Sequence, residues 1–585
     1  MLRPGSDVRA PNMLPDLDRR WRRRGTDAEP GVVASLQQAL QLPAPMCRLL
    51  AQRGCAEPMD AKRFLRPRLD QLHDPFALTD MQPLIARLLL ALDRGETILV
   101  HGDYDVDGIC ATALYTRVLR AQGGMVVPFV PHRLEDGYDF GRAGVRAAAE
   151  AGATLVLTGD CGIVAHEPIA AARSLGIDVL VTDHHTPGAV LPPASAVVNP
   201  GRADCTYPFR SLCGTGVAFK VCQALLRARA ADEEPLRWLL DLVALATVAD
   251  LVPLAGENRV LAHYGLRVLA QTRNPGLRAL LRSAGLDGRH VIGAGQVSHV
   301  LAPRINAVGR MGAAARGVEL LLADDDATAE RLAAVSASEN ETRRATDRAT
   351  LDEALELLAR DYDPARDHAV VLAAEHWHPG VIGIVASRVV EHIHRPAVLI
   401  ALDGATGRGS ARSIPAFDLF AGIHECAHLL ERYGGHRQAA GLEIRAERIP
   451  ELRAALNAHA RTVLGADDLV PELAYDLELP LADATPELHG LMRHLGPHGI
   501  GNPAPVFLAR AVDADGRMRV VGDGHARLRL AQGAACFDAI GFRLAARIGQ
   551  LDLSAPIDVA FQLHEDHWNG TPRLQLRLLD ARAAA

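Results

Sequence analysis

Four short apolar runs constrain the fold of this chain more than any other feature of its sequence. They cover residues 98–100, 125–130, 154–158 and 179–182, and helical stretches separate them. Strands that alternate with helical stretches of about 10–15 residues are typical of a parallel, doubly wound α/β sheet. Three of the four runs end on Asp or His. Because the carboxyl ends of parallel strands lie at one edge of a sheet, we expect these side chains to meet there.

The first run leads into the turn H-G-D-Y-D-V-D-G, which carries His101, Asp103, Asp105 and Asp107. Carboxylates this close repel one another unless a positive charge lies among them. Oxygen ligands beside an imidazole suit Mn²⁺, Mg²⁺ or Zn²⁺. The D-x-D-x-D-G order also opens an EF-hand calcium loop, but Leu114 occupies the loop position that requires glutamate. The turn is therefore predicted to form part of a metal site that is not an EF-hand.

Later parts of the sheet region supply more acids and histidines. The candidates are Asp160 in G-D-C-G, Asp183, His184 and His185 in T-D-H-H, and Asp250 in A-T-V-A-D-L-V-P-L. A carboxylate in apolar surroundings is costly unless it is paired or bound to a metal. Asp250 could instead cap a helix end, and Asp183 could cap a strand end beside two solvated histidines. Taken together, these residues predict a two-metal site in which shared carboxylates activate a water.

One further motif, H-E-C-A-H at residues 424–428, matches the helix of zinc proteases. The extended metzincin motif fails, because Glu431 and Gly434 stand where a glycine and a third histidine are required. Glu451 lies downstream, so spacing alone leaves a glutamate-ligand protease open. We favour a polar helix face as the explanation of this motif.

Charge and cysteine content bear on partners and location. The net charge of -7 argues against a uniformly basic surface, although a local basic groove remains compatible with it. The nine cysteines form no C-x-x-C pair, which fits a reducing cytosol. No apolar run approaches the ~18 residues of a membrane span, and the N-terminus lacks the apolar core of a signal peptide. We therefore expect a cytoplasmic protein.

Seven motifs carry a resemblance to a known family. In chain order they are D-Y-D-V-D-G, G-D-C-G-I, T-D-H-H-T-P-G, A-T-V-A-D-L-V-P-L, A-P-R-I-N-A-V-G-R, W-H-P-G-V-I-G-I-V-A-S-R and G-G-H-R-Q-A-A-G. Each motif alone is weak, but the ordered set is highly specific. From about Pro43 to the C-terminus the chain resembles the DHH phosphoesterase superfamily, and within it the bacterial exonucleases that act on single strands.

The resemblance and the composition together predict a domain order. An α/β fold is expected, in which a long helix joins a parallel-sheet DHH domain to a smaller α/β DHH-associated domain, followed by an OB-like β-barrel. The expected parts are a flexible basic arm at 1–30, the catalytic domain with N-terminal helices at 31–315, the connector helix at 316–362, the DHH-associated substrate-binding domain at 363–466 and the single-strand-binding barrel at 467–585. Short alternating strands and the hairpin signal Trp568-Asn569-Gly570-Thr571 favour the barrel.

The resemblance also implies two divalent ions, Mn²⁺ or Mg²⁺, and assigns their ligands. One ion would be held by His101, Asp105 and Asp160, and the other by Asp107, Asp160, His184 and Asp250, with Asp160 bridging. Asp103 would lie behind these ligands. His185 would touch the scissile phosphate and stabilise its developing charge or steer the leaving group, and Asp183 would orient a histidine. The residues implied to bind substrate phosphates are Arg133, Arg304, Asn306, Ser410, Arg412 and His436.

The activity that the resemblance implies is 5′→3′ hydrolysis of single-stranded DNA to 5′-mononucleotides in DNA repair and recombination. A helicase and a single-strand-binding protein are the expected partners of a monomeric enzyme, and Trp568 could stack on a base. An oligoribonuclease or cyclic-dinucleotide phosphodiesterase of the same superfamily is one alternative, although such enzymes typically lack the barrel. A non-catalytic replication scaffold is another, against which the intact carboxylates argue.

Overall fold

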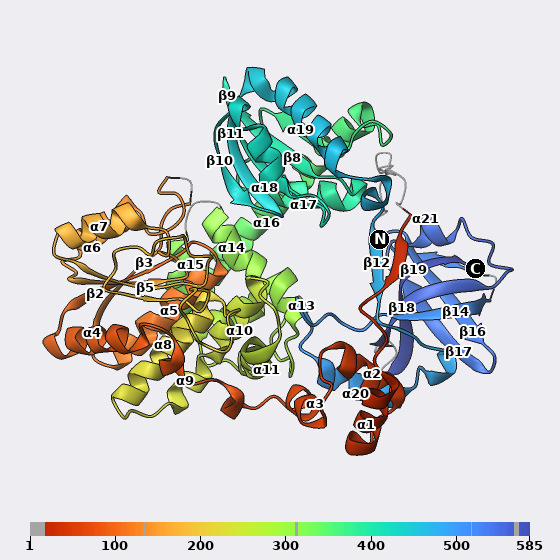
Figure 1. The fold of residues 1–585 in the computed structure, drawn as a ribbon, viewed down its shortest axis with the longest axis horizontal. Coiled ribbons are helices and arrows are strands. Elements are labelled where there is room, and N and C mark those ends of the chain that lie inside the picture. The colour runs from red at the N-terminus through yellow and green to blue at the C-terminus, as the bar shows by residue number, and fades with distance from the viewer. Residues whose placement is uncertain (1–17, 134, 311–313, 516, 567–571, 585) are drawn as a thin grey trace, which may run out of the picture.

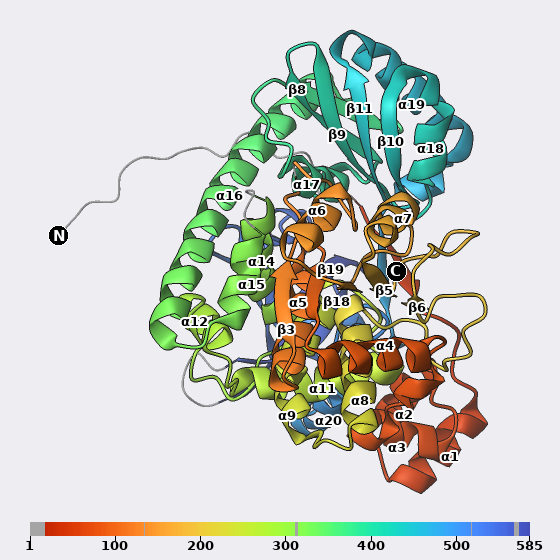
Figure 2. The ribbon, with the colours of Figure 1, turned by 90° about the vertical axis from the view of Figure 1, so that its left-hand side faces the viewer.

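The computed structural model describes residues 18–133, 135–310, 314–515, 517–566 and 572–584. Figures 1 and 2 show three lobes, which we call the large lobe, the upper lobe and the barrel. The large lobe runs from α4 (Met81–Arg94) to α15 (Ala315–Leu322), and the upper lobe from β7 (Val370–Ala374) to α19 (Ile449–Val463). The barrel domain follows them at the C-terminal end of the chain.

The large lobe is built on a five-stranded parallel sheet with the order β3-β2-β4-β5-β6. The strands are β2 (Thr97–Gly102), β3 (Met125–Phe129), β4 (Leu155–Gly159), β5 (Asp178–Thr182) and β6 (Ala196–Val198). The sequence predicted the first four, and β6 has only three residues, too few for a periodic signal.

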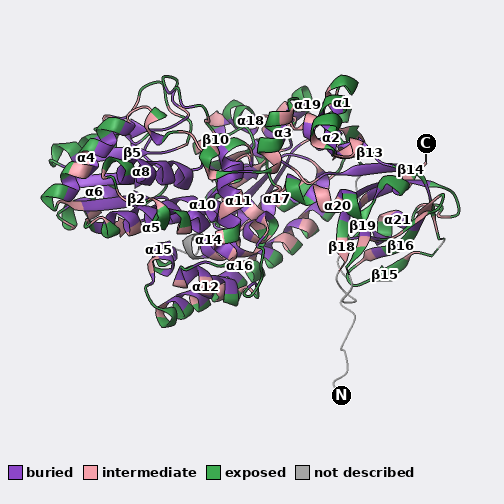
Figure 3. Ribbon diagram, turned by 90° about the horizontal axis from the view of Figure 1, so that it is seen from below, coloured by how far each residue is buried: buried purple, intermediate pink, exposed green. Residues whose placement is uncertain are grey.

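Alternate residues of each strand enter two different cores, as the pleat of a strand requires. Val100 and Leu157 pack with helices α4, α5 (Val106–Ala121) and α8 (Gly214–Ala228), whereas Leu99 and Val156 pack with α6 (Arg142–Glu150) and α7 (His166–Ser174). Figure 3 shows the sheet buried between these helices. Helices therefore cover both faces, which confirms the doubly wound α/β fold.

Two helices, rather than the single helix expected at 316–362, connect the lobes. After α15, the chain breaks at residues 323–325 and resumes as α16 (Asp326–Asp361). Asp325 causes the restart, since its side chain accepts a hydrogen bond of 2.8 Å from the backbone N–H of Thr328 and caps α16. Figure 2 shows α16 running along the side of the molecule from the large lobe to the upper lobe.

The upper lobe is a mixed five-stranded sheet with the order β10-β11-β9-β8-β7. Strands β8 (Ala397–Asp403), β9 (Thr406–Arg412), β10 (Leu430–His436) and β11 (Ala439–Arg445) follow β7 along the chain. Helix α17 (Ile382–Ile393) covers one face, and α18 (Leu419–Glu425) with α19 covers the other.

The H-E-C-A-H segment does not form the helix face of a zinc protease. Helix α18 ends at Glu425, and His428 lies in the following 3₁₀ turn, so its two histidines do not share one α-helix. The Nδ1 atom of His424 instead lies 2.7 Å from the hydroxyl of Tyr433. The polar-face interpretation of the motif is thus closer to what the structure contains, although only part of the motif is helical.

The barrel is closed by a pairing of β14 with β16. Its five strands are β14 (Phe507–Ala514), β16 (His525–Gln532), β17 (Ala535–Gly541), β18 (Ile557–Asp566) and β19 (Arg573–Ala583). This arrangement confirms the OB-like barrel. The hairpin signal and Trp568 lie outside the described residues.

The N-terminal segments belong with the barrel more than with the large lobe. Helices α1 (Pro30–Leu40), α2 (Ala44–Gln52) and α3 (Pro58–Leu65) share one hydrophobic core with the barrel, so the expected boundary at residue 31 does not describe the packing. Residues 1–17 lie outside the described chain, but the rest of the expected flexible arm is ordered. Its strand β1 (Arg20–Arg23) pairs in parallel with β12 (Glu472–Tyr475), because the arginines meet acids there.

Among the described residues, no single helix is both long and apolar enough to span a membrane. A pair bent by 82°, Leu69–Ala77 with Met81–Arg94, passes that test only when its two segments are combined. The apolar face of Met81–Arg94 is buried in the core of the large lobe.

Candidate metal centre

The turn after β2 owes its shape to Asp105 and two glycines. The Oδ1 atom of Asp105 accepts hydrogen bonds from the N–H groups of Asp107 (2.9 Å) and Gly108 (3.2 Å) and so caps α5. A Cβ atom at Gly108 would lie 2.3 Å from the backbone nitrogen of Asp103. At Gly102 it would lie 2.0 Å from the hydroxyl of Thr112. The turn therefore folds tightly against its own helix and directs three carboxylates to the edge of the sheet.

Asp107 is held by the beginning of another helix. Its Oδ2 atom accepts a 2.7 Å hydrogen bond from Gly214 N–H, and its Oδ1 atom accepts one of 2.7 Å from Thr215 N–H. Both donors belong to the first turn of α8, whose free N–H groups favour a negative charge. Asp107 is consequently held as a buried side chain by backbone N–H groups of α8.

Asp160 occupies the centre of the cluster. It follows β4 with a φ of 69°, a left-handed conformation that few residues other than Gly, Asn and Asp adopt and that is common at functional sites. Its side chain is buried, and burial together with the Asp107 and Asp105 carboxylates raises the pKa of Asp160 well above its usual range. Gly214 permits this position, because a Cβ atom there would lie 2.4 Å from Asp160 Cβ.

His184 contacts three carboxylates through one nitrogen. Its Nε2 atom lies 3.0 Å from Asp160 Oδ1, 3.6 Å from Asp250 Oδ2 and 3.8 Å from Asp107 Oδ2. Burial lowers the pKa of His184, which favours the neutral imidazole that binds metals. Burial, and then the charge of Asp107, raises the pKa of Asp250 to about 9.

His101 approaches the cluster from the end of β2. Its ring is buried between Phe129 and Phe140, with ring centroids 5.2 Å and 5.1 Å away. Its Nδ1 atom lies 3.5 Å from the sulfur of Cys161. Burial lowers the pKa of His101 to about 4, so this ring is neutral near pH 7.

Unpartnered buried atoms test whether a metal fits these residues. In the described chain, four such atoms belong to the cluster: His101 Nε2, Asp103 Oδ1, Asp160 Oδ1 and His184 Nε2. Buried polar atoms are nearly always satisfied by a partner. The possible ligand atoms form three groups, and within each group they all lie within 4.8 Å of one another. The groups are Asp160, His184 and His185; Asp107, His184 and Asp250; and Asp103, Asp105 and Asp160. Carboxylates and neutral imidazoles so arranged fit divalent cations.

The structure brings together possible ligand atoms of Asp105, Asp107, Asp160, His184 and Asp250, whereas His101 is in none of the three groups. Asp103, which was expected behind the ligands, offers an oxygen to one of the three groups. Burial, and then the Asp105 carboxylate, raises the pKa of Asp103 well above its usual range. Asp103 is therefore itself a possible metal ligand, together with Asp105 and Asp160.

Asp183 and His185 form a closely bonded pair beside the cluster. His185 Nδ1 lies 2.8 Å from Asp183 Oδ1, which also accepts hydrogen bonds from the backbone N–H groups of His184 and His185. Burial alone would raise the pKa of Asp183, but its bonds to His185 lower it. Burial opposes protonation of His185, and the hydrogen bond and charge of Asp183 outweigh it and raise the pKa of His185 to about 9.

Two residues that sequence reasoning gave no role lie beside this pair and the metal cluster. The hydroxyl of Tyr138 lies 3.0 Å from His185 Nε2, and the ring of Tyr104 packs edge-on against that of Tyr138. Tyr104 could have been noticed, because it stands between two of the clustered aspartates. Tyr138 lies in a loop far from them in sequence, and no local signal marks it.

A cavity of about 390 Å³ opens over the cluster. Its described lining consists of Asp103, Tyr104, Asp105, Val106, Asp107, Arg133, Tyr138, Ala249, Asp250, Leu251 and Asn306. The predicted phosphate-binding residues Arg133 and Asn306 are therefore at the site. Arg304 is not among the lining residues of the described chain, and its guanidinium donates a 2.7 Å hydrogen bond to the carbonyl of Val300.

The remaining predicted substrate residues lie on the upper lobe. Arg412 of β9 and His436 of β10 share one row across the sheet, because each pairs with Ala439 of β11. The guanidinium of Arg412 donates to Ser410 Oγ at 3.2 Å. Burial, and then the charge of Arg133, lowers the pKa of Arg412. A pocket lined by Arg133 of the large lobe and by Arg408 and Arg432 of the upper lobe lies between the two lobes.

Comparisons with known proteins agree with this architecture. The DHH family, N-terminal domain matches residues 97–247, the DHHA1 domain matches 367–462, and the RecJ OB domain matches 475–580. Single-stranded-DNA-specific exonuclease RecJ of Bacillus subtilis is 36% identical over 568 residues, which cover 96% of this chain and 70% of the relative. RecJ of Escherichia coli is 34% identical over 92% of this chain and 95% of the relative.

A solved structure gives the same result. RecJ of Thermus thermophilus in complex with Mn²⁺ has a TM-score of 0.83 and 33% identity, over 97% of this chain and 80% of that one. The sheet, its D-H-H strand end and the second α/β lobe define a phosphoesterase of the DHH class, as the motifs indicated. More narrowly, the chain belongs to the RecJ family of single-stranded-DNA-specific exonucleases.

Proposed function

We propose that this protein is a metal-dependent exonuclease that degrades single-stranded DNA from the 5′ end and releases 5′-mononucleotides. The observation that carries the proposal is the convergence of unpartnered histidine nitrogens and carboxylate oxygens at the carboxyl ends of β2, β4 and β5. Membership of the RecJ family supports the substrate. The direction of degradation is a prediction from the family resemblance.

The ligand atoms support two divalent ions, Mn²⁺ or Mg²⁺. One would be held by His101, Asp105 and Asp160, and the other by Asp107, Asp160, His184 and Asp250, with Asp103 available to the first. When bound, such a pair of ions lowers the pKa of a water and neutralises charge on the reacting phosphate. Backbone N–H groups hold two of these ligands, Asp105 and Asp107, in place.

The substrate-facing side chains have separate tasks in this proposal. His185, oriented by Asp183, contacts the scissile phosphate and stabilises the charge that develops there. Arg133 and Asn306 line the cavity and anchor phosphates of the strand. The terminal 5′-phosphate would lie on the upper lobe against Ser410, Arg412 and His436. Arg304 stays a predicted phosphate anchor beside Asn306, although it does not line the described part of the cavity.

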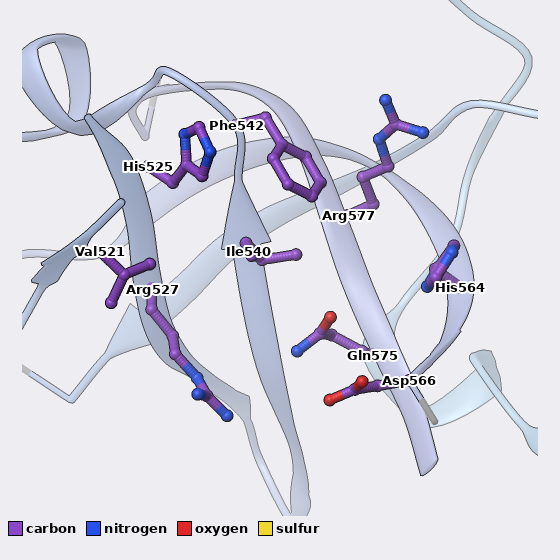
Figure 4. Close-up of a pocket in the computed structure, with 9 residues that line it drawn as sticks. All are labelled: Val521, His525, Arg527, Ile540, Phe542, His564, Asp566, Gln575 and Arg577. Atoms are coloured by element: carbon purple, nitrogen blue, oxygen red, sulfur yellow. The ribbon is translucent and has the colours of Figure 1, made fainter. Parts of the chain in front are cut away.

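The barrel would hold the strand that leads away from the site. Figure 4 shows its surface pocket, in which Phe542 lies between His525 and Arg577. Phe542 is 49% exposed, its ring lies 5.1 Å from that of His525, and the guanidinium of Arg577 lies 5.4 Å from its centroid. An exposed aromatic ring flanked by a cation is the arrangement on which bases of a single strand stack without sequence preference.

The wider biological assignments stay predictions. They are a role in DNA repair and recombination, a helicase that supplies single strands, a single-strand-binding protein, a monomeric state and a cytoplasmic location. A substrate restricted to single strands supports the helicase and the single-strand-binding protein as partners, because duplex DNA must be opened before it can be degraded.

Degradation of one oligonucleotide carrying either a 5′ or a 3′ label tests the function directly. With Mn²⁺ present, the 5′ label should appear at once as a mononucleotide, whereas the 3′ label should remain on progressively shorter strands. EDTA should stop both reactions. Asp160→Ala should abolish activity while the fold, judged by circular dichroism, is kept. Full activity of this variant would contradict the metal assignment, and early release of the 3′ label would contradict the direction.

A further inference from the structure

The hydroxyl of Tyr138 contacts the imidazole ring of His185. Tyr138 belongs to the loop between β3 and α6, and its hydroxyl is 3.0 Å from the Nε2 atom and 3.4 Å from the Nδ1 atom of His185. The Nδ1 atom of His185 is bonded to Asp183 at 2.8 Å. The ring of His185 is thus bonded to an acid at Nδ1 and is contacted from the side, near both nitrogens, by a phenol.

The loop fixes Tyr138 to the turn that carries the central carboxylate of the metal site. Asp139, the next residue, has a φ of 77°, and its Oδ1 atom accepts hydrogen bonds from the N–H groups of Phe140 (2.8 Å) and Gly162 (2.5 Å). Gly162 lies two residues after Asp160. A non-glycine residue at positive φ costs about 1–3 kcal/mol and persists only where the surroundings enforce it. This backbone conformation therefore places Tyr138 relative to the metal site.

The ring of Tyr138 is also confined from its sides. It meets the ring of His185 at 5.8 Å and that of Tyr104 at 6.2 Å, both nearly perpendicular. The guanidinium of Arg133 lies 5.0 Å from the centroid of Tyr104. Tyr104, Arg133 and Tyr138 all line the cavity over the metal cluster. The phenol hydroxyl consequently points along the wall of this cavity at His185.

We propose that Tyr138 is a positioning residue for His185, which it aims at the substrate phosphate before the strand arrives. The proposal rests on the proposed role of His185. The side chain of His185 is 44% exposed, so packing alone does not fix its ring. One hydrogen bond at Nδ1 leaves the ring free to pivot about that contact, and the Tyr138 hydroxyl beside the ring limits this freedom. Because the hydroxyl is not in line with Nε2, an incoming phosphate oxygen can take that position without rotation of the ring.

Tyr138→Phe removes the hydroxyl and keeps the ring contacts. Because small misplacements of a reacting group cost up to about 10²-fold in rate, we expect kcat on a labelled single strand to fall about tenfold. KM, Mn²⁺ affinity and the melting temperature should stay within error of wild type. Tyr264→Phe is the matched control, because it also loses one hydroxyl hydrogen bond, to the carbonyl of Pro67, in a different part of the large lobe. An unchanged kcat in Tyr138→Phe, or a loss of Mn²⁺ binding, would overturn the proposal.

A double variant tests whether Tyr138 acts through His185. In a His185→Ala background, Tyr138→Phe should cause no further loss in single-turnover rate, because residues that act as a unit are strongly non-additive. An undiminished tenfold effect would show that Tyr138 acts independently of His185 and would refute its positioning role.

A spectroscopic measurement separates this inference from the proposed function. In ¹⁵N-histidine-labelled, metal-free protein, the signal that disappears in His185→Ala should shift in Tyr138→Phe and not in Tyr264→Phe. No shift in Tyr138→Phe would overturn the inference whether or not the enzyme degrades DNA. A wild-type protein that degrades no single strand would instead count against the proposed function alone.

Discussion

The backbone of Asp160 is as unusual as its side chain. A left-handed φ and a buried carboxylate beside other carboxylates are both unfavourable, and the fold keeps both at one position. Sites that bind metals commonly trade stability for function in this way. The cost in stability can be measured with Asp160→Asn, because asparagine tolerates a left-handed backbone and carries no charge.

Asp160→Asn should therefore stabilise the metal-free protein while it abolishes activity. Replacing this carboxylate removes the cost of its raised pKa, about 1.4 kcal/mol for each pKa unit, which should raise the thermal midpoint in EDTA by a few degrees. The matched control is Asp80→Asn, since Asp80 also has a positive φ of 65° but pairs with the buried Arg202 at 2.7 Å. That control should lower the midpoint. A lower midpoint in both variants would refute the argument from charge.

Gly144 determines where the ring of His101 can lie. A Cβ atom at this helical position would be 2.6 Å from His101 Cδ2 and 2.9 Å from Phe140 Cδ2. Phe129 and Phe140 confine the His101 ring, so an added methyl group at residue 144 would force the ring to rotate away from the cluster. Gly144→Ala should weaken Mn²⁺ binding at least tenfold in calorimetry, despite the gain in helix propensity of about 1 kcal/mol.

Gly31→Ala provides the comparison for Gly144→Ala. It adds the same methyl group to a helix, α1, where nothing lies within 4 Å of the new atom. It should leave Mn²⁺ affinity unchanged. Equal affinities in both variants would mean that Gly144 has no part in placing His101.

At the scale of elements, β1 pairs with β12 and so fixes the linker that leads into the barrel, residues 472–475. The indole of Trp21 donates a 2.8 Å hydrogen bond to the buried Asp580, and the guanidinium of Arg582 lies 4.3 Å from the indole ring. These contacts anchor β1 to β19, and β1 in turn pairs with β12, which precedes the first barrel strand. β12 thus depends on a segment from the other end of the chain.

Trp21→Ala should release the linker without unfolding the barrel. Loss of a buried hydrogen bond and of the aromatic contact costs about 1–3 kcal/mol. Amide hydrogen exchange at residues 472–475 should accelerate about tenfold or more, while exchange in β18 stays slow. Unchanged exchange at residues 472–475 would show that the acids of the linker hold β1 without Trp21.

The elements that sequence reasoning found are those with local signals. The ends of β2, β4 and β5 were predictable because each strand carries its own apolar run and its own acid or histidine. The strand β1 was not, because its partner Glu472 is 452 residues away and its arginines resemble those of a solvated arm. The shared core of α1–α3 and the barrel, and the contact of Tyr138 with His185, were missed for the same reason.

The barrel pocket makes a separate prediction for strand binding. Phe542→Ala should weaken the binding of a long single strand by about 1–3 kcal/mol, the usual contribution of one stacked base. Fluorescence anisotropy in EDTA measures this loss without cleavage. Phe420→Ala removes an exposed ring from the upper lobe (39% exposed) and should leave binding unchanged. Equal losses in both variants would remove the reason to place the strand at this pocket.

At the scale of the whole molecule, the segment that leads into the barrel contacts the loop that follows the metal-site residue Asp250. The segment 494–503 that precedes the barrel contacts the loop after Asp250, where Leu254 N–H donates a 2.7 Å hydrogen bond to the carbonyl of Ile500. Arg259 of α11 (Gly256–Ala270) reaches the same segment and donates to the carbonyls of Leu495 and His494. One end of the metal cluster thus depends on contact between two lobes.

Two histidines make this contact sensitive to acid. Burial, and then the charge of Arg53, lowers the pKa of His498 to about 4. Burial, and then the charges of Arg267 and Arg259, lowers the pKa of His263 to about 4. Both values lie below the ordinary 6.5 of the unfolded chain. Between pH 6.5 and 4 the separated or unfolded state binds more protons, so the contact is fully stable above this range and weakens as the pH falls through it.

His498→Gln should reduce this acid sensitivity. At pH 5 the penalty from His498 reaches at most about 2 kcal/mol, because each pKa unit corresponds to 1.36 kcal/mol. The thermal midpoint of the wild type should therefore fall more between pH 7.5 and pH 5 than that of the variant, and the double variant with His263→Gln should fall least. His290→Gln, at an exposed position, should behave as the wild type. If His498→Gln loses as much stability on acidification as the wild type, the acid sensitivity of the molecule does not originate at this contact, and the lobes separate in acid for another reason.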